Sequence, residues 1–182
     1  MPLQTERTTI KRVPDRASYD REVIDSILDE AYVCHVGVVR DGAPIVTPTL
    51  HVRLDDHLVI HGSPASAMLR TATTQEICIT VTLVDGIVLA RSAFHHSINY
   101  RSVTVIGTPE VVPADEKAAA LDALVEKMVP GRIASLRPMT EKEVNGTSVL
   151  RLPISEASAK IRSGMPVDDE DDYELPIWAG VI

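Results

Sequence analysis

The sequence predicts a mainly β domain in which antiparallel strands form a barrel or a sandwich, with a few peripheral helices. Short β-branched runs recur with turn residues between them, which is typical of hairpin-linked strands. Helices do not alternate with strands as in a doubly wound fold, and no GxGxxG turn occurs. The 182 residues, 45% of them hydrophobic, suffice for one domain over 1–182, with an N-terminal arm (1–17) and a C-terminal tail (165–182) that packs on the barrel or on a partner.

An amphipathic helix is expected over residues 18–31, with Ser18 as its N-cap. Four apolar residues recur there at helical spacing: Ile24, Ile27, Leu28 and Ala31. Three strands follow, over 32–39, 44–53 and 58–61. If Asp41-Gly42 is a two-residue hairpin turn, His35 faces Pro48 across the first two strands. A short helix over 65–71 then starts with Ser63 as its cap and Pro64 at its first position.

The second half of the chain also alternates β-branched runs with turn residues. Strands over 77–84 and 87–94 are expected to form a hairpin about Asp85-Gly86, followed by a strand over 100–112 in which Gly107 marks a bulge. A helix over 114–129 ends at Pro130-Gly131. Thr140 and Glu143 have the spacing of a capping box, and a last strand spans 148–154.

Charge and composition exclude several partners. The net charge of −8 comes mainly from an acidic run at 168–174, and no basic stripe for nucleic acid is present. No apolar run is long enough for a membrane helix, and the start lacks a signal-peptide core, so a cytoplasmic protein is expected. Cys34 and Cys78 read as buried hydrophobes rather than as disulfide or zinc ligands. No pair of the six histidines has persuasive ligand spacing, and no metal site is predicted.

Two segments carry candidate chemistry. At His61-Gly62-Ser63-Pro64-Ala65-Ser66 a strand ends and a helix starts with hydroxyls in its first turn, which suits a phosphate, although an ordinary helix cap explains it too. The segment 90–102 gathers two arginines, three serines, two histidines, an asparagine and two aromatic residues. Such groups suit a phosphate and the edge of a heteroaromatic ring, and the alternative is a polar hairpin loop.

At these residues the chain resembles the FMN-binding split-barrel family related to pyridoxamine 5'-phosphate oxidase. Within that family it is similar to the flavin-nucleotide-binding group that includes the nitroimidazole-resistance (Nim-type) reductases. The stretches that carry the resemblance lie in order along the chain: 58–63 with 65–66, 99–103 closing on Gly107, 137–138 with 147–149, and 175–180. The resemblance implies a six-stranded antiparallel split β-barrel, a small-molecule substrate, and a homodimer with flavin at the subunit interface.

The resemblance and the two segments described above together give the expected site residues. His61 and His96 are the expected catalytic proton donors. The expected cofactor-binding residues are Pro48, Thr49, His51, His61, Gly62, Ser63, Ser66, Arg70, Thr80, Val81, Thr82, Arg91, Ser92, Asn99, Tyr100, Arg101, Ser102 and Trp178. One departure concerns the phosphate turn, where Ala67 and Met68 stand in place of the family's basic residue, so Arg70, Arg91 or Arg101 must meet the phosphate charge. Trp178 either fills a groove of the core or reaches the partner's flavin pocket.

The expected activity is that of an FMN-dependent oxidoreductase. It reduces a nitroaromatic or nitroimidazole compound, or oxidises an amine such as pyridoxamine phosphate. Two alternatives stay open: a flavin-binding or storage module without turnover, and a barrel that binds haem or a deazaflavin, with FAD as a further cofactor candidate.

Overall fold

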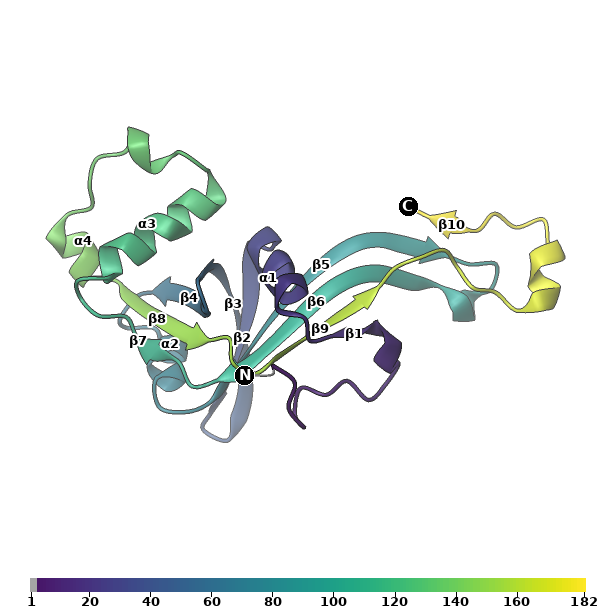
Figure 1. The fold of residues 1–182 in the computed structure, drawn as a ribbon, viewed down its shortest axis with the longest axis horizontal. Helices are drawn as coiled ribbons and strands as arrows, with labels where there is room; N and C mark the ends of the chain where they lie inside the picture. Colours follow the sequence, from purple (N-terminus) through teal and green to yellow (C-terminus); the bar gives the residue numbers. More distant parts are fainter. Residues whose placement is uncertain (1–2) are drawn as a thin grey trace.

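The computed structural model describes residues 3–182, so Met1 and Pro2 of the expected N-terminal arm lie outside the described residues. It shows one antiparallel sheet that coils around a core without closing, as a split barrel does (Figure 1). The strand order is β1-β9-β6-β5-β2-β3-β4-β8-β7, and β10 pairs with β5. The mainly β, antiparallel fold predicted from the hairpin-like texture is confirmed.

Ten strand segments and four α-helices make up the described chain. The strands are β1 (Ala17–Ser18), β2 (Val33–Arg40), β3 (Ala43–Leu54), β4 (His57–Gly62), β5 (Ile77–Leu89), β6 (Ser97–Gly107), β7 (Glu110–Val111), β8 (Ser148–Pro153), β9 (Ala157–Arg162) and β10 (Gly180–Val181). The helices are α1 (Arg21–Glu30), α2 (Ala67–Ala72), α3 (Lys117–Met128) and α4 (Glu141–Asn145). Short 3-10 turns lie at Pro14–Arg16, Ala93–His95, Ile133–Ser135 and Glu170–Glu174.

The β2–β3 hairpin has the predicted register, with His35 opposite Pro48. Asp41 and Gly42 take the positive φ values, 54° and 77°, that a two-residue hairpin turn requires. The Thr140–Glu143 capping box at the start of α4 is also present. Local turn chemistry therefore determines these two features.

Two predicted helix caps are wrong by a few residues. Ser18 belongs to β1 and pairs with Ala159, so Asp20 caps α1 and accepts a hydrogen bond from the Glu22 N–H. At α2 the N-cap is Ser66 instead of Ser63. The reason is a preceding turn, in which the Ser66 N–H donates to the Ser63 carbonyl oxygen at 2.8 Å.

The predicted hairpin at Asp85-Gly86 is wrong. β5 runs through these two residues as one strand with a bulge, and the turn to β6 comes after Leu89. The main chains of Ile87 and Ile182 exchange hydrogen bonds of 2.8 and 3.1 Å, which hold this part of β5 extended. No run of β-branched residues marks β9, so the sequence does not predict this strand.

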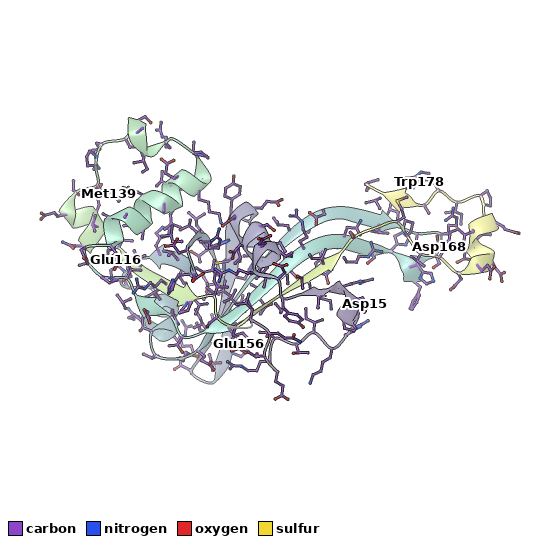
Figure 2. All side chains as sticks on the ribbon, viewed as in Figure 1. Asp15, Glu116, Met139, Glu156, Asp168 and Trp178 are labelled. Atoms are coloured by element: carbon purple, nitrogen blue, oxygen red, sulfur yellow. The ribbon has the colours of Figure 1, made fainter. Side chains whose placement is uncertain are left out.

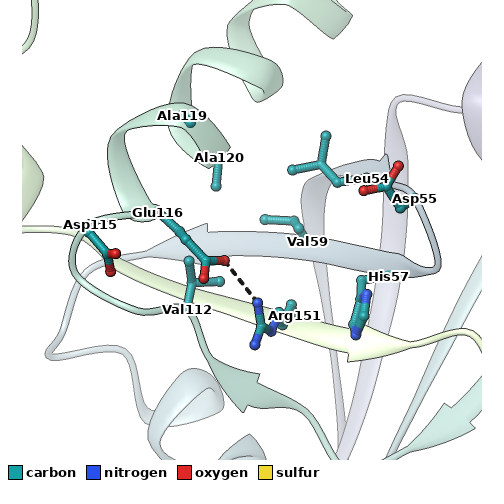
Figure 3. A pocket seen from close by; sticks show the side chains of 10 residues that line it. All are labelled: Leu54, Asp55, His57, Val59, Val112, Asp115, Glu116, Ala119, Ala120 and Arg151. Carbon is teal, nitrogen blue, oxygen red and sulfur yellow. Dashed lines mark hydrogen bonds and ion pairs between the residues drawn. The ribbon is translucent and has the colours of Figure 1, made fainter.

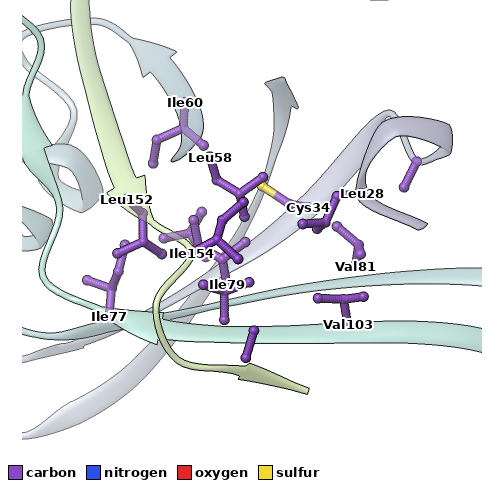
Figure 4. Packing of buried hydrophobic residues seen from close by; sticks show 14 of the residues in the cluster. Leu28, Cys34, Leu58, Ile60, Ile77, Ile79, Val81, Val103, Leu152 and Ile154 are labelled. Atoms are coloured by element: carbon purple, nitrogen blue, oxygen red, sulfur yellow. The ribbon is translucent and has the colours of Figure 1, made fainter. Parts of the chain in front are cut away.

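Two hydrophobic clusters position the strands. The larger fills the barrel, and α1 contributes Ile24, Ile27 and Leu28 to it. Figure 4 shows Leu28 beside Cys34, Val81 and Val103 of the strands. The smaller lies outside the barrel wall, between α3 and the outer faces of β3, β4 and β8. Its buried members are Val52, Val59, Val112, Ala120, Leu121, Leu124 and Val149. The outer faces of β2, β5 and β6 contribute no residue to either cluster.

The distal halves of β5 and β6 extend beyond the barrel as an arm, here defined as residues 84–100 (Figure 1). The C-terminal tail runs back along this arm, where Gly180 and Val181 of β10 pair with Leu89 and Val88. Side chains cover the arm and the tail along their length (Figure 2). None of the helices in residues 3–182 is long and apolar enough to cross a membrane.

Candidate functional site

Five strands present one row of side chains on the outer surface of the sheet. The row follows the register across β3, β2, β5, β6 and β9: Pro48, His35, Thr80, Thr104 and Ser158. The chain neighbours of these residues, among them Val36, Ile79 and Val81, are buried in the barrel. Because side chains alternate along a strand, the row points outward. Ser158 is buried, so the row presents the hydroxyl groups of Thr80 and Thr104 and the His35 imidazole. We call this row, together with Thr82, Ser102 and Lys160 of the next one, the outward face.

The hydroxyl pattern continues toward the arm. Thr82, Ser102 and Lys160 form the next row of the register on the same side. Beyond them lies a shallow cavity of about 440 Å³, lined by Thr82, Val84, Ser97, Ile98 and Tyr100. The predicted residues Thr80, Thr82, Tyr100 and Ser102 therefore come together on one surface that combines hydroxyl groups with exposed apolar side chains.

His61 lies on β4, where it pairs with Val149 of β8. Its Nδ1 is buried and has no hydrogen-bond partner among residues 3–182. Burial lowers the pKa of His61, which keeps the imidazole neutral at pH 7. The other expected proton donor, His96, is exposed in the arm, where its Nδ1 lies 2.8 Å from the Ser92 carbonyl oxygen. The chain does not bring these two histidines together within one barrel.

The two serine hydroxyl groups of the phosphate turn accept hydrogen bonds from main-chain N–H groups of the same segment. Ser63 Oγ accepts a hydrogen bond from the Ala65 N–H at 3.1 Å, and Ser66 Oγ accepts one from the Leu69 N–H at 3.4 Å. Gly62 is needed for close packing, because a Cβ there would lie 3.1 Å from Leu69 Cδ1. Arg70 is exposed in the last turn of α2 and forms no ion pair within residues 3–182.

The expected arginines of the second segment are held by carboxylates. Arg101 lies 2.5 Å from Glu30 Oε2 and 2.7 Å from Asp85 Oδ1, and its hydrogen bonds lower the pKa of both carboxyl groups. Arg91 binds Asp168 of the tail at 2.9 Å and lies over the Tyr173 ring. Both guanidinium groups thus join separate parts of the chain.

Three other expected residues lie in the arm or the tail, each in different surroundings. Asn99 is buried, where it donates to the Gly164 carbonyl oxygen and accepts from Arg162. Ser92 Oγ is buried without a partner in the described chain. Trp178 is 64% exposed on the tail, where its ring packs over Gly180. The structure therefore places Trp178 on the tail beside the arm, outside the barrel core.

Three expected residues point away from the outward face. Val81 is buried in the barrel, and Thr49 lies opposite the buried Cys34. His51 is fully buried, with Nε2 at 3.0 Å from the Leu28 carbonyl oxygen and 3.2 Å from Lys127 Nζ. Burial lowers the pKa of His51 to about 4 and that of Lys127 to about 8.

His35 and Thr104 complete the outward face but were not among the expected site residues. The signal for His35 was available, since the predicted register already placed it opposite Pro48. Thr104 could have been found from the spacing of Ser102 and Thr104, which alternate with Val103 and Val105. Lys160 and Ser158 could not, because β9 was not predicted.

The fold is that of a split barrel, and the comparison with known families agrees. Residues 20–161 match the family model described as pyridoxamine 5'-phosphate oxidase, so the chain belongs to that family. No curated protein matches the chain.

Three solved structures show the range of similarity. The flavocytochrome Anf3 from Azotobacter vinelandii is 44% identical, with 98% of this chain and 84% of that chain covered and a TM-score of 0.92. The FAD and heme binding protein from Mycobacterium smegmatis is 42% identical over 92% and 83% of the two chains, with a TM-score of 0.88. A putative 5-nitroimidazole antibiotic resistance protein from Bacteroides thetaiotaomicron VPI-5482 is 24% identical over 80% and 86%, with a TM-score of 0.67, and shows the fold alone.

Proposed function

We propose that the chain is a flavin-binding oxidoreductase of the flavocytochrome kind, which binds haem as a second cofactor. The observation that carries the proposal is the outward face, a surface of hydroxyl groups with an adjoining apolar cavity. The similarity to a flavocytochrome over nearly the whole chain supports it. Flavin supplies the electron transfer, while the protein binds and orients it.

The outward face fits the two sides of a flavin ring system. Thr80, Thr82 and Ser102 offer hydroxyl groups to the polar, nitrogen- and oxygen-bearing edge. Val84 and Ile98 offer apolar contact to the remainder of the ring. Tyr100 lies in the same cavity and adds an aromatic side chain, the kind of surface on which a planar ring packs.

We propose FAD rather than the FMN expected from the sequence. The serines of the phosphate turn cap their own helix, and Ala67 and Met68 provide no charge there. The terminal phosphate of FMN would therefore meet no cationic side chain at this turn. The diphosphate of FAD instead distributes its charge over a longer stretch of the protein surface. The Mycobacterium smegmatis relative described as binding FAD supports this choice.

The first experiment identifies the cofactors in the purified protein. We expect a flavin absorption spectrum, and chromatography of the released flavin to give FAD. Valine at Thr80 and Thr82 together should weaken flavin binding by about tenfold, since each lost hydrogen bond contributes about 0.5–1.5 kcal/mol. Thr74→Val, in an exposed loop, is the matched control. A colourless protein that shows no saturable fluorescence quenching on addition of FAD or FMN would refute flavin binding.

A haem site is supported by His61. Burial favours the neutral form of the His61 imidazole, its Nδ1 has no hydrogen-bond partner among residues 3–182, and neutral imidazole is the form that binds iron. We expect His61→Ala to abolish the Soret band of reconstituted protein while flavin absorption is retained. His57→Ala, four residues along the same strand face, is the control. A Soret band unchanged in His61→Ala excludes this histidine as the ligand.

The substrate follows from the redox chemistry. Reduction of a nitroaromatic or nitroimidazole compound and oxidation of a pyridoxamine-phosphate-like amine both proceed at a flavin. Steady-state assays with a chemical reductant and a nitroaromatic acceptor test the first, and assays with the amine and oxygen test the second. A flavin that is reduced and reoxidised without turnover of either compound would instead favour the storage module.

A further inference from the structure

His35 is the imidazole of the outward face, and it is exposed. His51, His95 and His96 each have a hydrogen-bonding or ion-pairing partner, whereas the side chain of His35 has none within residues 3–182. His35 lies on β2 directly opposite Thr80 of β5. Because opposed residues on one face of a sheet have Cβ atoms about 4.5–5.5 Å apart, a polar group bound by the Thr80 hydroxyl lies within reach of the imidazole.

The surface beside His35 leaves room for a planar group. The next residue of β2 on this side is Gly37, which has no side chain and lies opposite Cys78. Gly37, Val46, Cys78 and Ile106 line a shallow apolar cavity of about 300 Å³. The polar part of the outward face thus lies between this cavity and the one beside the arm, and His35 stands at its edge.

The other charged groups around this imidazole differ from it in distance or in charge. Burial raises the pKa of the Cys78 thiol, which favours its neutral form. Glu76, further along β5, is paired with Arg7 at 2.8 Å. β3 presents no titratable group opposite His35. Lys160 lies two strands beyond β5, whereas β2 is the direct neighbour of β5. His35 is therefore the cation-forming side chain nearest to the hydroxyl groups of β5 on this face.

We infer that His35 binds the polar edge of a flavin on the outward face and, as the imidazolium, favours the reduced flavin over the oxidised one. The inference rests on the proposed flavin binding. Reduction adds two electrons and one proton to the ring system, which leaves one negative charge at its polar edge. An imidazolium donates a charge-assisted hydrogen bond to such a group, while the oxidised ring is uncharged and gains less.

The test compares the midpoint potential of bound FAD with that of free FAD at pH 6 and pH 8.5, by dithionite titration of the reconstituted protein against a reference dye. Imidazole is the side chain that ordinarily changes its charge between pH 5 and 8. The difference between bound and free FAD should be more positive at pH 6 by about 30 mV in the wild type. This shift corresponds to about tenfold tighter relative binding of reduced FAD, as expected for one hydrogen bond to a charged group.

Two variants of His35 separate its charge from its hydrogen bond. His35→Gln keeps an N–H donor without charge, so its difference should be the same at both pH values. His35→Lys keeps a positive charge and should retain the wild-type pH 6 difference at pH 8.5. The control is His57→Gln, which should behave as the wild type, because His57 lines a cavity between α3, β4 and β8, away from the outward face (Figure 3). Thermal unfolding verifies that each variant is folded.

The inference is overturned if His35→Gln has the pH dependence of the wild type, or if His35→Lys loses the pH 6 difference at pH 8.5. Either result, obtained with flavin bound, removes the role of His35 and leaves the proposed function standing. A wild-type protein that shows no fluorescence quenching with FAD or FMN instead removes both.

Discussion

His51 shows how burial of one side chain sets a pH dependence. Its pKa is about 4 in the folded protein and 6.5 in the ordinary state, because burial and the nearby Lys127 ammonium disfavour the imidazolium. Between these pH values the unfolded chain binds a proton that folded His51 does not. The free energy of unfolding should therefore fall as the pH is lowered from 6.5 toward 4, by roughly 3 kcal/mol at most.

Urea unfolding at pH 7 and pH 4.5 measures this loss. His51→Gln, whose amide can still donate to the Leu28 carbonyl oxygen, should have a shallower pH dependence than the wild type. The carboxyl groups contribute equally to both proteins and cancel in the comparison. His35→Gln on the exposed surface is the control. Identical pH slopes for wild type and His51→Gln would contradict the proposed role of burial.

Arg101 connects α1 to the bulge of β5 through two ion pairs, and this structural role can be tested. Because Arg101 binds Glu30 and Asp85, Arg101→Gln and Glu30→Gln should each lower the melting temperature by a few degrees, and the double variant should add little further loss. If Arg101 instead binds the flavin phosphate, as the resemblance implies, Arg101→Gln alone weakens flavin affinity and Glu30→Gln does not. Thermal unfolding and flavin titration of the same three variants distinguish the two roles.

The residue scale also shows what a sequence can predict of the site. The position of His35 opposite Pro48 followed from a turn of two residues, since such a turn fixes the register of both strands. The partners of Arg101 could not be foreseen, because Glu30 and Asp85 lie 71 and 16 residues away along the chain and meet only in the folded barrel.

At the element scale, Gly86 decides how the tail joins the arm. A Cβ at this position would lie 2.7 Å from Val181 Cγ1 and 3.2 Å from the Ile182 carbonyl oxygen. Gly86→Val should therefore displace β10 and cost about 1–3 kcal/mol of stability, as overpacking does. Amide hydrogen exchange of Ile87 and Ile182, whose main chains bond each other, should become fast.

A matched glycine in another strand provides the control. A Cβ at Gly37 meets its nearest atom, the Cys78 carbonyl oxygen, at an ordinary 3.5 Å, so Gly37→Ala should leave the exchange of Ile87 and Ile182 protected. Slow exchange in Gly86→Val would show that the tail tolerates the added side chain.

The surroundings of Gly86 also explain why the hairpin predicted at Asp85-Gly86 is wrong. Asp-Gly between β-branched runs is a strong hairpin signal, and it was correct at Asp41-Gly42. At Asp85-Gly86 the partners are β6 on one side and the tail on the other, so tertiary pairing overrides the local preference. The strand β9 was missed for the opposite reason, because its short Ala-Ser-Ala-Lys start has no strand texture while its pairing with β6 still forms.

For the whole molecule, the arm supports the homodimer that the resemblance implies. Apolar side chains that are about half exposed or more line the arm and tail: Val84, Ile87, Ile98, Trp178 and Ile182. A surface of this kind is usually covered by a partner, and we propose a second copy of the chain. Light scattering after gel filtration should give twice the chain mass of 19.8 kDa.

Aspartate at Val84 and Ile98 together should convert this dimer to a monomer and weaken flavin binding, since the same residues line the cavity beside the outward face. Aspartate at Val111, 63% exposed on β7, should leave the dimer intact. A wild-type protein of monomeric mass would contradict the proposal.

The position of Trp178 has a practical consequence for such measurements. It is the one tryptophan of the sequence, it lies on the tail beside the arm, and nothing in the described chain buries its ring. Its emission therefore reports on the arm alone, without interference from the barrel core. A blue shift on raising the protein concentration would signal that water leaves the indole as two arms meet, and energy transfer to a bound chromophore would signal loading of the cofactor.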